Sequence, residues 1–239
     1  MQTIKLLYEK EFHINDDISV MIPTVGQVLK DEDVYYDAVS MLTAMPIDLM
    51  VQLDDIGIDF TTIDEYELFL NMTEALKKMD MKLVFGNLDF SKFNFAISER
   101  TGELVLFNDE NNIIIDRIVH NKVAMILRKI NNIERDDRRP GNDAAKEYMI
   151  ERARKKQKRA KNRKTFSQLE QLIIAMVNTE QFKYDFESVM DLTIYQFNES
   201  VRQVIKKVDY DNVMHGVYAG TVNPKDLNQS ELTWFLNEK

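Results

Sequence analysis

The chain contains no cysteine, and only seven glycines and four prolines occur among its 239 residues. The absence of cysteine excludes disulfide scaffolds, cysteine-based zinc sites and thiol catalysis, and it fits a reducing cytosol. No apolar run approaches the roughly 18 residues that a membrane span requires. The first residues show neither a long apolar run nor a cleavage-like site, so no signal peptide is predicted. The scarcity of glycine and proline predicts a chain dominated by regular structure.

Charge is distributed unevenly along the chain. Hydrophobic residues make up 44% and charged residues 30%, which is ordinary for a globular protein with a core. The formal net charge is −9, yet residues 152–164 hold nine basic residues and no acidic one. Without these nine positive charges, the net charge of −9 becomes −18 for the rest of the chain. An acidic body repels a phosphate backbone, so any nucleic-acid role depends on this one segment.

Helices and strands are both predicted in the N-terminal part. Thr24 and Gln27 have the spacing of a capping box, and Thr62 and Glu65 repeat it. A helix is predicted over about 33–45, and a second short one begins at Pro46.

Strands are predicted at 18–23 and 82–86, and a hairpin joins 94–98 to 103–107. Within this hairpin Phe93, Phe95 and Ile97 alternate with polar neighbours. Such alternation predicts that one face of the hairpin is buried.

Residues 132–143 carry the strongest boundary signal, because mixed charge is followed by Pro140-Gly141 and then by Asn142 as an N-cap. The predicted division gives an α+β domain over 1–140 and a mainly helical domain over 141–239. The predicted fold class is therefore α+β.

The helix predicted from Asn142 begins with Ala145, Tyr148, Met149 and Ala153 on an apolar face, and then loses its apolar stripe. Its second half is therefore predicted to project from the body. The candidate basic-helix residues are Arg152, Arg154, Lys155, Lys156, Lys158, Arg159, Lys161, Arg163 and Lys164.

Nucleic-acid binding by this helix requires interleaved aromatic side chains or a groove-reading fold. The nearest aromatic residues, Tyr148 and Phe166, only flank the basic run. Contact with solvent or with an acidic protein surface, such as a neighbouring copy, is the favoured interpretation. Nucleic-acid contact is the weaker alternative.

The C-terminal part carries two amphipathic stripes. One runs through 169–177 with helical spacing. The second advances by three and four residues, the spacing of a coiled-coil seam, and packing within the domain is favoured over an intermolecular seam. A final short helix presents an aromatic tail that docks on the body or on a partner. The candidate partner-binding residues are Ile194, Phe197, Val201, Val204, Val208 and Trp234.

No catalytic constellation is present in the sequence. The three histidines, His13, His120 and His215, lie far apart, and no phosphate-binding loop or nucleophile elbow occurs. We therefore predict no catalytic, metal-binding or cofactor-binding residue and a protein that is not an enzyme.

Three stretches resemble a known group of proteins. They are IPTVGQVL followed by YYDAVSMLTAMPIDLMVQLDDIGIDF, then RPGNDAAKEYMIERARKK with FSQLEQLIIAMVN, and finally DLTIYQFNESVRQVIKKVDYDNVMHGVYAGTVNPKDLNQSELTW. Together they are similar to a protein encoded among the tail genes of phages and prophages of low-GC Gram-positive bacteria (Firmicutes). YAGTV is the most distinctive motif.

The resemblance implies a role in tail building. One form is a tail assembly chaperone that binds phage tail proteins, such as the tape-measure protein, before tube polymerisation. The alternative is a structural tail or baseplate component. The first predicts a location in the host cytoplasm, and the second predicts a place in the virion tail. A homo-oligomer is compatible with either form, and no membrane partner or cofactor is implied.

Overall fold

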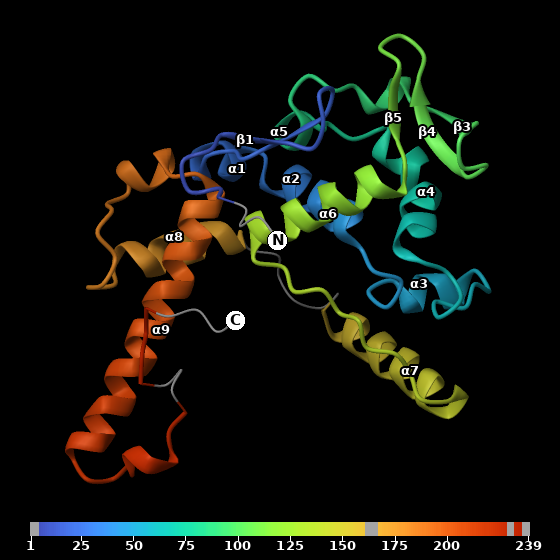
Figure 1. Ribbon diagram of the computed structural model, residues 1–239. Helices are drawn as coiled ribbons and strands as arrows, with labels where there is room; N and C mark the ends of the chain where they lie inside the picture. Colours follow the sequence, from blue (N-terminus) through green and yellow to red (C-terminus); the bar gives the residue numbers. More distant parts are fainter. Residues whose placement is uncertain (1–4, 161–166, 229–231, 236–239) are drawn as a thin grey trace.

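A computed structural model describes residues 5–160, 167–228 and 232–235 of the chain. The N-terminal part combines short strands with helices, and the C-terminal part is mostly helical (Figure 1). The α+β prediction is confirmed. Among the described residues, no helix is both long and apolar enough to cross a membrane.

The N-terminal part begins with an antiparallel pair of strands and ends with a long helix. Its elements are β1 (Glu11–His13), β2 (Ser19–Met21), α1 (Val25–Lys30), α2 (Glu32–Thr43), α3 (Met50–Asp55), α4 (Glu65–Leu76), α5 (Lys82–Phe85), the 3-10 helix η1 (Phe90–Lys92), β3 (Asn94–Ile97), β4 (Leu104–Asn108), β5 (Ile113–Ile115) and α6 (Arg117–Asn131). The C-terminal elements are α7 (Asp143–Ala160), α8 (Gln168–Val177), η2 (Ser188–Asp191), α9 (Ile194–Tyr218) and η3 (Pro224–Asp226).

Side-chain caps determine where several helices begin. The capping box of Thr24 and Gln27 is confirmed at α1. The box predicted at Thr62 is wrong, because α4 begins two residues later, where Asp64 accepts from the Glu67 N–H and the Glu67 side chain accepts from the Asp64 N–H. An aspartate caps as well as a threonine does, so spacing alone could not choose between the two positions.

The strand predicted at 82–86 is a helix. The Asp80 side chain accepts a hydrogen bond from the Lys82 N–H, which starts α5, and Gly86 ends it with a φ of +63°. A four-residue apolar run has no periodicity that distinguishes a buried turn of helix from a buried strand. The strand prediction was therefore wrong.

The predicted hairpin is confirmed as β3 and β4, and β5 completes a three-stranded antiparallel sheet. The predicted burial of its alternating face is only partly right. Phe93 is fully buried, but Phe95 and Ile97 are 45% and 63% exposed. The sheet extends past the body at this end, and no described residue buries Ile97, the last residue of the alternating face.

Two apolar clusters hold the elements together. The larger cluster unites both parts of the chain, with α6 packing on α2 and α9, and it includes Leu169, Ile173, Ile194 and Phe197 from the C-terminal part. The smaller cluster centres on α3 and the start of α4, and Met149 and Ile150 of α7 pack against it. The first turns of α9 are therefore part of the main core.

His120 of α6 lies inside the main core, 2% exposed, with its ring stacked on Phe69 at 4.3 Å between centroids. Burial, aided by the Arg128 guanidinium, lowers the pKa of His120 from 6.5 to about 4. The unfolded chain binds this proton as the pH falls through 6.5, whereas the folded chain binds it only near pH 4.

The stability that neutral His120 contributes is therefore complete above pH 6.5 and is lost between pH 6.5 and 4. We expect its contribution to the free energy of unfolding to fall by about 3 kcal/mol across this window. Urea denaturation at several pH values measures it, and His120→Phe should remove this part of the slope. His215→Gln, at an exposed position, should leave the slope intact. Equal slopes in wild type and His120→Phe would contradict the assignment.

Candidate interaction surfaces

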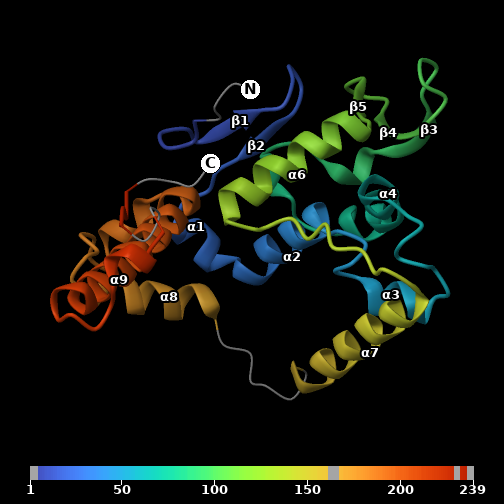
Figure 2. The same cartoon turned by 60° about the horizontal axis from the view of Figure 1, so that its bottom comes forward.

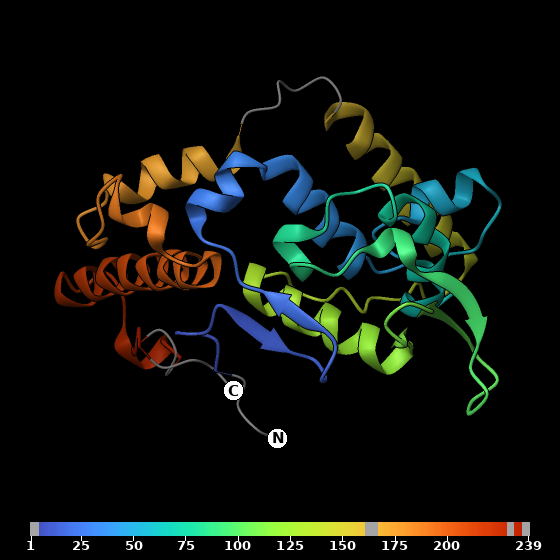
Figure 3. The same cartoon turned by 90° about the horizontal axis from the view of Figure 1, so that it is seen from above.

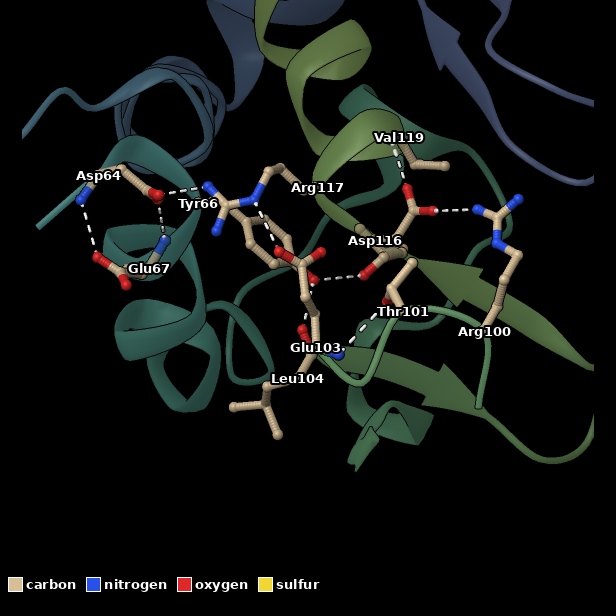
Figure 4. Close-up of polar contacts among 11 residues, drawn as sticks. Asp64, Tyr66, Glu67, Arg100, Thr101, Glu103, Leu104, Asp116, Arg117 and Val119 are labelled. Atoms are coloured by element: carbon tan, nitrogen blue, oxygen red, sulfur yellow. Dashed lines mark hydrogen bonds and ion pairs between the residues drawn. The ribbon is translucent and has the colours of Figure 1, made fainter. Parts of the chain in front are cut away.

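Charged side chains gather where α4, α6 and the hairpin meet (Figure 4). Arg117 forms ion pairs with Asp64 and with Glu103, and its guanidinium lies 5.1 Å from the centre of the Tyr66 ring. The Tyr66 hydroxyl is within hydrogen-bond distance of the Leu104 and Ile115 carbonyl oxygens, at 3.1 and 3.0 Å. These contacts tie the hairpin to both helices.

The carboxylates of this network already have structural roles. Asp116 caps α6 by accepting from the Val119 N–H, and it lies 3.9 Å from Arg100. Burial alone would raise the pKa of Asp64, but hydrogen bonds from the Glu67 N–H and from Arg117 lower it overall. Desolvation raises the pKa of Tyr66. In the part of the chain that the structure describes, no group of three or more His, Asp or Glu residues could hold a metal ion.

The basic helix α7 lies against α3, at the opposite end of the molecule from α8 and α9 (Figure 2). Arg154 was expected in a projecting segment. Its guanidinium instead forms ion pairs with Asp54 and Asp55, at 2.6 and 2.5 Å. Lys146 pairs with Asp59 at 2.8 Å, and this hydrogen bond, with those from Thr61, lowers the pKa of Asp59 to about 2. The acidic surface that anchors the helix thus belongs to the same chain.

The other candidate basic residues face solvent where the structure describes them. Arg152, Lys156, Lys158 and Arg159 are exposed, and Lys155 pairs with Glu151 within the helix. Lys161, Arg163 and Lys164 lie outside the described residues.

Tyr148 was expected on the buried face of α7, but it is 63% exposed, while Ile150 takes the inward position. Tyr148, Arg152, Lys155 and Arg159 follow one another at helical spacing on the solvent side. One aromatic ring thus accompanies the exposed cations.

The candidate partner-binding residues of α9 fall into two groups. Ile194 and Phe197 are fully buried, and Val201 and Val204 are half-buried against the main core. Val208 is half-buried beyond that core. The second half of α9 extends away from the rest of the molecule (Figure 1).

The chain after α9 returns along this second half. The Thr221 and Val222 N–H groups both donate to the Gly216 carbonyl, at 2.9 and 3.1 Å. A Cβ at Gly216 would lie 2.7 Å from the Val222 side chain, so the close approach requires glycine there. Lys207 lies 5.8 Å from the centre of the Trp234 ring, which places this candidate residue beside α9. We call the second half of α9 (205–218) and its returning segment (219–228 and 232–235) the α9 arm.

The α9 arm exposes large apolar side chains. Ile205 is 55% exposed, Tyr218 79% and Phe235 64%. These three side chains lie at separate positions of one projecting element, where each offers apolar contact to a partner. The sequence indicated the apolar stripe of α9, but it could not indicate that the core covers only the first half.

A comparison with protein families gives a match that includes this region. Residues 155–239 match the YomV second domain. This family is derived from Bacillus phage, and the match points to a phage origin in Firmicutes. The matched segment contains α8, α9 and the α9 arm, and it covers about one third of the chain. Comparison with curated proteins and with solved structures gave no match for either.

Proposed function

We propose that the chain is a non-enzymatic phage tail morphogenesis protein that acts as a tail assembly chaperone. It binds a tail protein, in the first place the tape-measure protein, before the tail tube polymerises. The observation that carries the proposal is the α9 arm within a segment matching a phage-derived family. Its exposed apolar side chains offer a surface on which the apolar face of a client helix can pack.

The client-binding proposal assigns a role to individual residues of the arm. Ile205 and Tyr218 provide exposed apolar contact, and Phe235 adds an aromatic ring from the returning segment. Trp234 packs edge-to-face with Phe235 at 6.0 Å between ring centroids. Aromatic anchors of this kind contribute much of the binding energy in protein interfaces.

The test is quantitative mass spectrometry of purified particles and of infected-cell lysate, with the protein affinity-tagged in the lysate. A chaperone is expected to be absent from particles and to co-purify with tail proteins from lysate. A fixed ratio to the tail tube protein in particles would establish the structural alternative. Absence from particles together with failure to capture tail proteins would refute the tail assignment.

Matched variants locate the client surface. We expect Ile205→Glu to reduce capture of the tail protein at least about tenfold, because it places a charge at an exposed apolar contact of the α9 arm. Ile118→Glu is the control, since Ile118 is equally exposed (58% against 55%) but lies on α6, outside the α9 arm. Equal capture by both variants would exclude the α9 arm as the binding surface.

One observation favours a second candidate function, the binding of nucleic acid by α7. The exposed ring of Tyr148 lies on the same helix face as Arg152 and Arg159, which combines stacking with positive charge. Binding of this kind should weaken steeply as salt increases, and neutralising Arg152, Lys156 and Arg159 together should abolish it. A salt-independent or absent signal would exclude this function.

A further inference from the structure

α7 makes only shallow contact with the rest of the protein. None of residues 143–159 in this helix is buried, although the shorter α6 has seven buried residues. α7 lies beside α3 (Figure 3), and it has no continuous apolar stripe that a core could cover. It therefore lies on the body as a docked helix does, and not as a core helix.

The side of α7 that faces the body has the pattern of a docking helix. Met149 and Ile150 pack on the smaller apolar cluster, between the ion pairs that Lys146 and Arg154 form with aspartates of the body. Helices that bind the surfaces of other proteins present apolar anchors at this spacing of three and four residues. Two cations with apolar side chains between them thus define the chemistry that this surface accepts.

α7 fills this surface incompletely. Ala145 and Ala153 are half-buried on the same side of the helix, and each contributes only a methyl group. The cluster beneath is bordered by three partly buried methionines, Met45, Met50 and Met72, whose flexible side chains adapt to larger neighbours. A helix with larger apolar side chains in place of the two alanines would therefore bury more surface than α7 does.

We propose that the surface beneath α7 is a docking site for a basic amphipathic helix of a partner protein, and that α7 occupies this site until the partner displaces it. Charge determines the kind of helix, because Asp54, Asp55 and Asp59 attract cations and repel an acidic helix. Naming this partner as the client tail protein rests on the proposed function, whereas the surface itself does not.

The test measures binding of a fluorescein-labelled peptide to the full chain by fluorescence anisotropy. The peptide carries residues 143–160 with Ala145→Leu and Ala153→Leu. We expect it to bind at least about tenfold tighter than the unsubstituted peptide, because each leucine adds apolar contact. The full-chain variant Arg154→Glu should bind it tighter still, since repulsion from the aspartates of α3 releases the chain's own α7 and opens the site.

Charge reversal separates docking from general attraction between the peptide and an acidic chain. Asp54→Lys with Asp55→Lys should abolish binding of the peptide. Asp16→Lys with Asp17→Lys is the matched control, because it changes the net charge equally at two exposed aspartates of the β1–β2 turn and should leave binding largely unchanged. A peptide that also carries Arg154→Glu should bind the chain with Asp54→Lys and Asp55→Lys, which a misfolded chain would not do.

Failure of the peptide to bind the Arg154→Glu chain would overturn the proposal, and so would equal binding to the two charge-reversed chains. A dimer held by exchange of α7 between two copies would also overturn it, because the site would then serve a second copy, and sedimentation equilibrium detects such a dimer. These results do not depend on capture of a tail protein by the α9 arm, so the failure of one proposal is distinguishable from the failure of the other.

Discussion

Replacing Arg128 with alanine is expected to lower the free energy of unfolding by about 3–5 kcal/mol, since it leaves a buried carboxylate without its main partner. The Arg128 guanidinium lies 2.5 Å from Glu65 and donates to the Thr43 carbonyl at 2.6 Å. Both charged side chains are over nine-tenths buried. The other Glu65 oxygen lies 3.1 Å from Arg135, without hydrogen-bond geometry, and Arg135 is half-exposed. Arg135 alone therefore compensates little.

Chemical denaturation followed by far-ultraviolet circular dichroism measures this loss. Arg117→Ala is the control, because its ion pairs with Asp64 and Glu103 are partly exposed and should contribute only about 0–1 kcal/mol each. The double variant Glu65→Leu with Arg128→Met should be less destabilised than Arg128→Ala, since no charge remains buried. A loss for Arg128→Ala no larger than that for Arg117→Ala would mean that water reaches Glu65 readily.

Phe197→Ala is expected to cost about 3–5 kcal/mol, the usual range for removing a fully buried aromatic ring from a core. Phe197 is 0% exposed and packs edge-on against Phe182 at 6.2 Å between ring centroids. It belongs to the same apolar cluster as Leu127 and Ile130 of α6. Loss of this side chain should therefore destabilise the N-terminal part as well.

The comparison variant is Val208→Ala, at the half-buried end of the same stripe and outside the main core. It should cost only about 1 kcal/mol. Thermal unfolding of Phe197→Ala should remain one transition at a lower temperature, because both parts share one core. A separate early transition confined to α8 and α9 would show that the two parts unfold independently.

Sequence patterns predicted elements whose signals are local. The capping box at Thr24 and the hairpin around Gly102, whose φ is +71°, depend on residues a few positions apart. The amphipathic stripe beginning at Ile194 is local in the same sense, and its first residues are buried. Such signals are sufficient to predict the α+β class.

The errors arose where distant residues decide the outcome. Arg154 is held by Asp54 and Asp55, which lie about one hundred residues earlier in the chain, and no local pattern indicates that contact. The exposure of Phe95 depends on where the body ends beneath the sheet. The exposure of α9 is also decided by distant residues. Its apolar stripe continues along the helix, but the main core covers only the first half. The surfaces proposed for binding are therefore those that local patterns could not distinguish from core.

Because ion pairs provide much of the attachment of α7, this helix should detach before the rest of the protein unfolds. Its inward contacts are the ion pairs of Arg154 and Lys146, together with Met149 and Ile150 on the smaller cluster. Detaching α7 breaks partly exposed ion pairs, which salt weakens, and leaves the main core intact. Its backbone amides should therefore exchange with solvent through a local opening well below the free energy of global unfolding. Raising the ionic strength should therefore favour detachment of α7 while the main core stays folded.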